Sequence, residues 1–199
     1  MRKVGIFGGT FNPPHLGHVS SAEAFVKYVD LDELIIMPDY LPPHKVADAL
    51  VSADDRMQMC NLAFSHIDKV KISDLEISRG GKSYTAVTLT ELSSPDTRLY
   101  FLCGTDMFLT LDRWYDFKTI FNLAVICYVR RESDEKTGLE IERKKEEYKE
   151  KYNASIIEIP SDVVAVSSSE LRGEILCGRD NRLLPKCVCD YIEAKGLYK

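Results

Sequence analysis

The sequence predicts an α/β fold in which a doubly wound parallel sheet carries helices on both faces. Short runs rich in β-branched residues alternate along the chain with amphipathic stretches of helical period. Most of these runs lack the two-residue alternation of a half-exposed strand, which indicates strands buried on both faces. Strands and helices that alternate in this way are joined by crossover connections, and these favour a parallel sheet.

The elements follow from these patterns in chain order. The predicted strands are Lys3–Phe7, Glu33–Met37, Val70–Ser73, Arg98–Cys103, Ala124–Val129 and Ser155–Ile159. The predicted helices are Leu16–Val29, Asp54–Ile67, Ser83–Leu92, Leu139–Tyr152, Ser168–Leu176 and Pro185–Lys195.

Particular residues support the individual helices. The first carries an apolar stripe of 3.6-residue period at Val19, Ala22, Val26 and Val29. Asp54 and Ser83 suit the N-caps of the second and third helices. Pro185 suits the first position of the last helix, and Gly196 follows its end. Residues 140–151 mix both signs of charge, which is typical of a solvated helix face.

Length and composition indicate one globular domain over residues 1–199, with a small C-terminal helical portion. The 199 residues suffice for one core, and no repeat, low-complexity tract or long linker divides them. The net charge of −5 argues against nucleic acid as the main partner, because that binding needs clustered Lys and Arg. No apolar run is long enough for a membrane span, and residues 1–7 are too short for a secretory signal. The oligomeric state stays open.

The six cysteines are scattered, and several lie inside apolar runs. A reduced thiol in such a run behaves as a small hydrophobic group. Cys187 and Cys189 lack both zinc-ligand spacing and a second pair that would complete four ligands. We therefore expect structural thiols and a cytoplasmic protein.

A phosphate-binding loop is predicted after the first strand. Gly8, Gly9 and Thr10 let the backbone approach a ligand closely, and a helix N-terminus follows near residue 16. His15 and His18 are three residues apart, so both can face one ligand. The alternatives are a Gly-Pro turn with two surface histidines and a zinc site. Zinc would need a third ligand, so we predict no bound metal here.

A second candidate phosphate site lies near the C-terminus, where Ser167 and Ser168 precede Arg172. Hydroxyls at a helix start form an anion-binding nest, and the guanidinium adds a fixed positive fork. Taken alone, this segment is equally well explained as a serine N-cap.

The two segments together resemble the nucleotidyltransferases related to class I aminoacyl-tRNA synthetases. Residues 10–18, Thr-Phe-Asn-Pro-Pro-His-Leu-Gly-His, match the (T/S)-F-(D/N)-P-x-H-x-G-H motif, and residues 166–172 are similar to I-S-S-T-x-x-R. The resemblance implies a Rossmann-like fold and catalytic roles for His15, His18 and Arg172. It also implies ATP binding by a wider set, namely Gly8, Gly9, Thr10, His15, His18, Gly104, Asp106, Ser167, Ser168 and Arg172.

Further strings resemble one family within this group, the nicotinate-nucleotide adenylyltransferases of bacterial NAD synthesis. They are Pro42-Pro43-His44-Lys45, Ser83-Tyr84-Thr85, Gly104-Thr105-Asp106 and Trp114-Tyr115. The resemblance implies AMP transfer from ATP to nicotinate mononucleotide, which yields deamido-NAD and pyrophosphate. It places the mononucleotide against His44, Lys45, Tyr84, Thr85, Trp114 and Tyr115.

The residues leave alternatives for these assignments. Lys45 can equally be an exposed turn lysine, Tyr84 and Thr85 an ordinary helix start, and the single Trp114 a core residue. Asn12 and Ser169 stand where many relatives have Asp and Thr, and Arg131 lacks the usual Arg-Pro-Gly context.

The function leaves alternatives as well. They are an adenylyltransferase of the same fold for nicotinamide mononucleotide, phosphopantetheine or FMN, and a non-catalytic ATP-binding regulator. A fragment of an aminoacyl-tRNA synthetase is disfavoured by the acidic net charge. Mg²⁺ is expected to arrive with ATP, held by phosphates and water.

Overall fold

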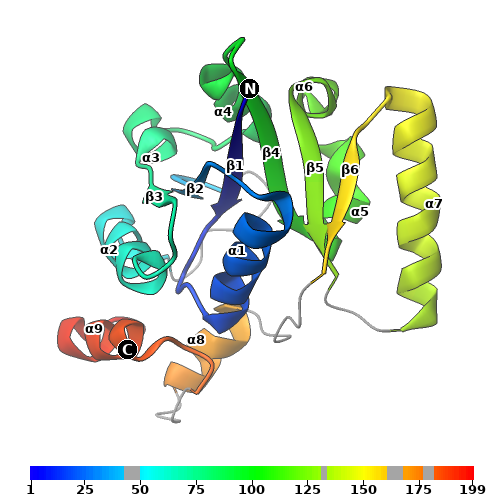
Figure 1. Cartoon of the computed structure of the whole chain (residues 1–199). Coiled ribbons are helices and arrows are strands. Elements are labelled where there is room, and N and C mark those ends of the chain that lie inside the picture. The colour runs from blue at the N-terminus through cyan, green and yellow to red at the C-terminus, as the bar shows by residue number, and fades with distance from the viewer. Residues whose placement is uncertain (43–49, 131–133, 161–167, 177–181) are drawn as a thin grey trace.

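A computed structural model describes residues 1–42, 50–130, 134–160, 168–176 and 182–199 of the protein. Its strands form one parallel six-stranded sheet in the order β3-β2-β1-β4-β5-β6 (Figure 1). Every predicted strand is confirmed to within two residues at either end. The strands are β1 Arg2–Gly9, β2 Glu33–Pro38, β3 Val70–Ile72, β4 Thr97–Gly104, β5 Ala124–Val129 and β6 Ile156–Ile159.

The helices agree with the sequence prediction in most bounds. Those of α1 and α8 coincide with the predicted ranges. The described helices are α1 Leu16–Val29, α2 Ala53–Phe64, α3 Leu75–Arg79, α4 Thr85–Leu92, α5 Thr105–Thr110, α6 Phe117–Leu123, α7 Glu135–Tyr152, α8 Ser168–Leu176 and α9 Lys186–Lys195, with a short 3₁₀ helix, η1, at Leu111–Arg113.

Several predicted helix starts are wrong, because other residues provide the caps. The N-cap of α2 is Ser52, whose hydroxyl accepts from the Asp55 amide, and not Asp54. Asp134 caps α7 and begins that helix four residues before Leu139. Pro185 stands at the N-cap of α9 and not at its first helical position.

The start of α4 also differs, because Ser83 is used elsewhere. Its hydroxyl accepts a hydrogen bond from the Tyr40 amide at 2.9 Å, so the helix begins two residues later at Thr85. The sequence did not predict α3, α5, η1 and α6. These elements span three to seven residues, which is too short for a helical period to stand out.

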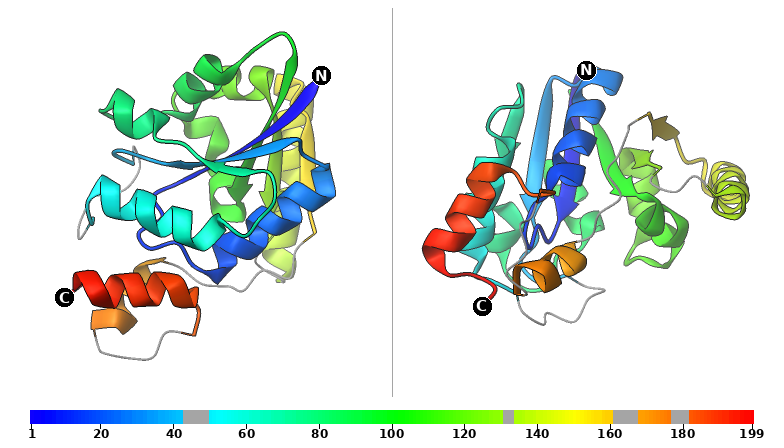
Figure 2. Two further views of the ribbon diagram at one scale, coloured as in Figure 1. Left: turned by 60° about the vertical axis from the view of Figure 1, so that its left-hand side comes forward. Right: turned by 90° about the horizontal axis from the view of Figure 1, so that it is seen from below.

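The sheet separates two hydrophobic cores, as the doubly wound prediction requires. Alternate residues of β1 belong to different cores: Ile6 packs with Phe108 of α5 and Phe121 of α6, whereas Phe7 packs with Phe25 of α1 and Phe64 of α2. Both views in Figure 2 show helices on the two faces of the sheet. Helix α9 covers α2 and extends the second of these cores through Val188 and Ile192.

The order of the strands reverses at β1, which pairs with β2 on one side and with β4 on the other. Chains leaving β1 and β4 therefore turn toward opposite faces and leave a crevice beyond the strand ends. This is the switch point at which a ligand site is expected.

Three cysteines match their prediction as buried thiols: Cys60, Cys103 and Cys127 are free and buried. Cys187 is exposed, and Cys189 is partly exposed. In the described part of the chain, no helix is long and apolar enough to cross a membrane.

Gly5 allows the sheet and the first crossover to approach closely. A Cβ at this position would lie 2.5 Å from Leu31 Cδ1 and 2.8 Å from Phe25 Cε1. We expect Gly5→Ala to lower the free energy of unfolding by about 1–3 kcal/mol, because extra volume in a packed core forces its neighbours to move. Urea denaturation measures this change.

Gly8→Ala is the matched control, because its added Cβ would meet only the Met37 carbonyl oxygen at 4.0 Å. Its unfolding free energy should stay within about 0.5 kcal/mol of the wild-type value. Equal losses in the two variants would contradict the packing explanation.

Candidate active site

The predicted phosphate loop leaves β1 and enters α1 through residues 10–15. Phe11 anchors it: the ring is 1% exposed and makes edge contacts with Phe7 and Phe64. The backbone of Phe11 has a positive φ of 47°. The loop is thus held from the core side, and its next residues reach the start of α1.

His15 and His18 cap the start of α1 reciprocally. His15 Nδ1 accepts from the His18 amide at 3.3 Å, and His18 Nδ1 accepts from the His15 amide at 3.2 Å. The two rings stack with centroids 3.6 Å apart. Because each Nδ1 accepts a hydrogen bond, each ring carries its proton on Nε2. Both imidazoles are therefore neutral N–H donors in this arrangement.

The helix N-terminus is less open than the sequence suggested. The Leu16 amide donates to the Leu183 carbonyl at 2.9 Å, and the His18 amide is used by His15. These donors were expected to be free for an anion. A contact from the distant end of the chain, together with the histidine cap, occupies them.

The second predicted phosphate segment adjoins the first loop. Ser168 Oγ donates to the Pro13 carbonyl at 3.0 Å, across 155 residues of sequence. Arg172 Nη1 donates to the Asn12 carbonyl at 2.8 Å, and its Nη2 contacts Ser169 Oγ at 3.1 Å. The two motifs therefore meet, but these donors support the loop backbone. Ser167 lies outside the described residues.

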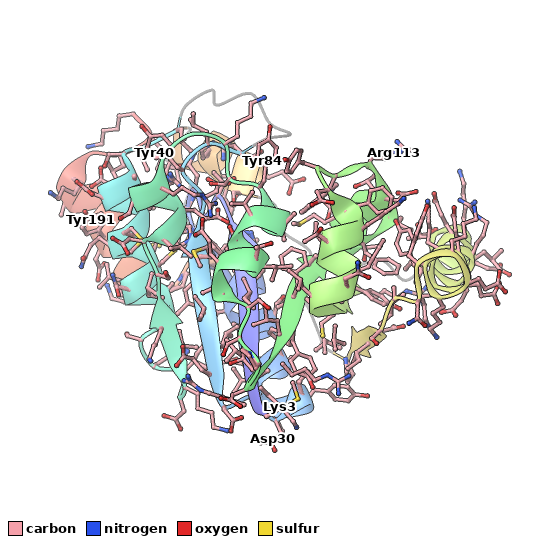
Figure 3. All side chains as sticks on the ribbon, turned by 90° about the horizontal axis from the view of Figure 1, so that it is seen from above. Lys3, Asp30, Tyr40, Tyr84, Arg113 and Tyr191 are labelled. Atoms are coloured by element: carbon pink, nitrogen blue, oxygen red, sulfur yellow. The ribbon has the colours of Figure 1, made fainter. Side chains whose placement is uncertain are left out.

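A cavity of about 160 Å³ opens at the switch point, beside the start of the loop. Residues at or just beyond the carboxyl ends of β1, β2 and β4 contribute to its wall. Figure 3 shows Tyr40 and Tyr84 at this end of the sheet, opposite Lys3 and Asp30. The lining residues are Gly8, Gly9, Thr10, Asp39, Pro42, Glu76, Ser83, Thr85, Phe101, Asp106, Met107 and Trp114.

Several residues assigned from sequence to the nucleotides line this cavity. Thr10 comes from the first loop, Thr85 from the start of α4, and Asp106 from the first turn of α5. Gly104 forms the N-cap of α5. His15 ends the loop that begins with Thr10, and His18 lies in the first turn of α1; neither is part of the cavity wall.

Two aromatic side chains, Phe101 and Trp114, line the cavity, whereas Tyr84 and Tyr115 are not part of its wall. Trp114 is partly exposed, lines the cavity and makes an edge contact with Phe101. Tyr84 and Tyr115 face each other with centroids 4.5 Å apart, and Tyr115 is 57% exposed. This placement favours the pocket interpretation of Trp114 over a core role. His44 and Lys45, the remaining residues predicted for the mononucleotide, lie outside the described residues, as does Arg131.

A buried ion pair that the sequence did not reveal holds Thr10 in place. Arg56 of α2 is 1% exposed and donates to Asp39 Oδ1 at 3.2 Å and to the Thr10 carbonyl at 3.0 Å. Asp39 Oδ2 in turn accepts the Thr10 hydroxyl proton at 2.8 Å. The hydroxyl proton of Thr10 is thus committed to Asp39, which leaves the Oγ1 lone pairs for other partners.

Glu76 is a second carboxyl group in the cavity wall that the sequence did not predict. Burial raises its pKa, although hydrogen bonds from Thr88 and Ser83 and the charge of Arg79 act in the opposite direction. Arg79 Nη2 lies 3.8 Å from Glu76 Oε1 and is a cation that faces this carboxyl group.

One of these missed residues had a usable signal. Asp39 directly follows the second strand, and polar residues at the carboxyl ends of parallel strands are typical of ligand sites. Arg56 had none, because one arginine in a charged helix resembles any solvated arginine.

The Arg56–Asp39 pair generates a prediction about stability. Arg56→Met should lower the free energy of unfolding by about 3–5 kcal/mol, because it leaves a carboxylate unpaired in a buried site. Combining it with Asp39→Asn should recover part of that loss. A double-mutant cycle by urea denaturation measures the coupling, and strictly additive losses would contradict the proposed pair.

Comparison with known proteins gives the family. The Cytidylyltransferase-like family model matches residues 6–174. A probable nicotinate-nucleotide adenylyltransferase of Listeria monocytogenes is 34% identical over 198 residues, covering 98% of this chain and 97% of the relative. A protein of the same description from Lachnoclostridium phytofermentans is 38% identical over 201 residues and is matched over its full length.

Solved structures agree in fold. The nicotinic acid mononucleotide adenylyltransferase of Plasmodium falciparum, in complex with NaAD, superposes with a TM-score of 0.77. The two chains share 20% identity, with 100% of this chain and 98% of the other covered. Together with the full-length matches above, the paired motifs at one loop place this chain in the cytidylyltransferase-like family, among the nicotinate-nucleotide adenylyltransferases.

Proposed function

We propose that this protein transfers AMP from ATP to nicotinate mononucleotide, forming deamido-NAD and releasing pyrophosphate. The observation that carries the proposal is the meeting of two motifs, 155 residues apart, at a loop beside a switch-point cavity. The names of the full-length relatives support the same reaction. ATP and the mononucleotide are the proposed small-molecule partners.

The proposed chemistry is an in-line displacement at the α-phosphorus of ATP. An oxygen of the mononucleotide phosphate forms the new P–O bond while the bond to pyrophosphate breaks. The attacking phosphate is already anionic near neutral pH, so the step needs no general base. Catalysis then depends on positioning and on stabilising the charge of the transition state.

His15 and His18 suit that task as neutral donors. With Nδ1 accepting a backbone amide, each ring would direct an Nε2–H donor at a phosphate oxygen of the bound nucleotide. Thr10, Gly8 and Gly9 would accompany them at the α-phosphate end. Ser168 and Arg172, which bond to the loop backbone, would hold that loop in place beside the β- and γ-phosphates. Asp106 and Gly104, at the start of α5, are assigned to the adenosine moiety.

Mg²⁺ is proposed to bind with the triphosphate. Within the described residues, no group of three or more His, Cys, Asp or Glu side chains is arranged to hold a metal ion. Asp39, which lines the cavity, is already paired with Arg56 and Thr10. We therefore propose that the ligands of the Mg²⁺ ion are mainly phosphate oxygens and water molecules.

The nicotinate carboxylate is assigned to the start of α4, beside Trp114 and the Tyr84–Tyr115 pair. Asp39 and Glu76 also line the cavity, and a negative charge on either would repel the nicotinate carboxylate. The charge of Asp39 is balanced by Arg56, and Glu76 pairs with Arg79 at 3.8 Å. An acidic ring substituent is therefore compatible with this cavity, and Trp114 can stack on the pyridinium ring.

The choice of acceptor can be tested by supplying Mg-ATP with nicotinate mononucleotide or nicotinamide mononucleotide. We expect both mononucleotides to yield pyrophosphate and dinucleotide in the same assay. The kcat/KM for nicotinate mononucleotide should be at least about tenfold higher than that for nicotinamide mononucleotide. A higher kcat/KM for the amide would overturn the acceptor assignment. If neither mononucleotide led to pyrophosphate release, the protein would be better explained as an ATP-binding regulator or as a transferase for another acceptor.

His18→Ala tests the role of the histidines. Loss of one donor to the transition state should lower kcat by about 10²–10³-fold. His66→Ala is the matched control, because that exposed histidine pairs with Glu23 of α1 and does not line the cavity. Near wild-type kcat in His18→Ala would refute the assignment.

A further inference from the structure

The end of the chain turns back toward the phosphate loop. Helix α9 ends at Lys195 and is capped by Gly196, whose φ of 63° lies in the left-handed region that glycine adopts readily. The Leu197 amide bonds to the Ile192 carbonyl at 3.0 Å across this turn. Tyr198 follows, also with a positive φ, and packs against the core that contains Phe11.

Tyr198 contacts the loop through one hydrogen bond. Its hydroxyl donates to Asn12 Oδ1 at 2.7 Å, across 186 residues of sequence. Asn12 is 3% exposed, and the same Oδ1 also accepts from the Val51 amide at 3.4 Å. The Asn12 side-chain oxygen therefore has two donors from elsewhere in the chain and is directed into the protein.

The donor role of Tyr198 is secure over a wide pH range, because burial raises the pKa of its hydroxyl. The backbone around Asn12 is supported from the same side. Arg172 bonds to the Asn12 carbonyl, and Leu183 accepts the Leu16 amide at the start of α1. The loop segment from Asn12 to Leu16, which includes His15, is thus fixed at both ends by residues of the C-terminal part.

We propose that Tyr198 is a positioning residue for the transfer reaction. Its hydroxyl fixes the Asn12 side chain, and through Asn12 it fixes the backbone that leads to His15. Tyr198 itself does not line the cavity. The inference rests on the proposed function, since it assigns His15 to a phosphate.

Tyr191 offers a matched control on the same C-terminal segment. Its hydroxyl donates to Asp55 Oδ1 at 2.8 Å and so connects α9 to α2, not to Asn12. Tyr198→Phe and Tyr191→Phe each delete one phenolic hydroxyl and keep the ring. Each should lower the free energy of unfolding by a similar amount, about 0.5–1.5 kcal/mol.

The kinetic effects should differ. We expect Tyr198→Phe to lower kcat/KM for ATP about tenfold, because small displacements of catalytic groups reduce rates steeply. KM for the mononucleotide should stay within about twofold of its wild-type value, and Tyr191→Phe should keep near wild-type kinetics. In an Asn12→Ala background, Tyr198→Phe should have no further effect, since the two residues act in series.

A binding measurement separates this inference from the proposed reaction. Calorimetric titration with a non-hydrolysable ATP analogue should show weaker binding in Tyr198→Phe than in Tyr191→Phe, whatever the acceptor. That result supports the inference even if nicotinate mononucleotide is not the substrate. The inference would be overturned if Tyr198→Phe and Tyr191→Phe changed the kinetics and the analogue affinity equally.

Discussion

Parallel pairing of the strands places every carboxyl end of the sheet at one edge. In this chain β1 lies between β2 and β4, so the loops after these strands diverge over that edge and enclose the cavity. Residues separated widely in sequence, such as Thr10, Asp39 and Asp106, therefore share one wall. The site depends on this strand order more than on any single side chain.

The phosphate loop is held mainly through its carbonyl groups. Arg56 donates a hydrogen bond to the carbonyl oxygen of Thr10. Arg172 donates to the carbonyl oxygen of Asn12, and Ser168 donates to that of Pro13. A carbonyl oxygen that accepts a hydrogen bond from within the protein does not direct its partial negative charge at an anionic ligand. Basic and hydroxyl side chains behind the loop can thus favour phosphate binding without contacting the phosphate. Ser168 and Arg172 of the second motif can act in this way.

The elements predictable from sequence were those with local signals. Buried strands, the stripe of α1 and the glycine after α9 each depend on a few neighbouring residues. The spacing of His15 and His18 predicted that they would lie together, but not that each would accept the amide of the other. Arg56, the Leu16–Leu183 bond and the Tyr198–Asn12 bond join residues far apart, and no local pattern records such contacts.

Trp114, the only tryptophan in the chain, lines the cavity and remains partly exposed. Its indole emission can therefore be excited selectively and assigned to one place in the molecule. A nucleotide ring that stacks on the indole would change the intensity or wavelength of that emission. The protein thus carries an intrinsic optical reporter of its own site, and occupancy can be followed in solution without a label.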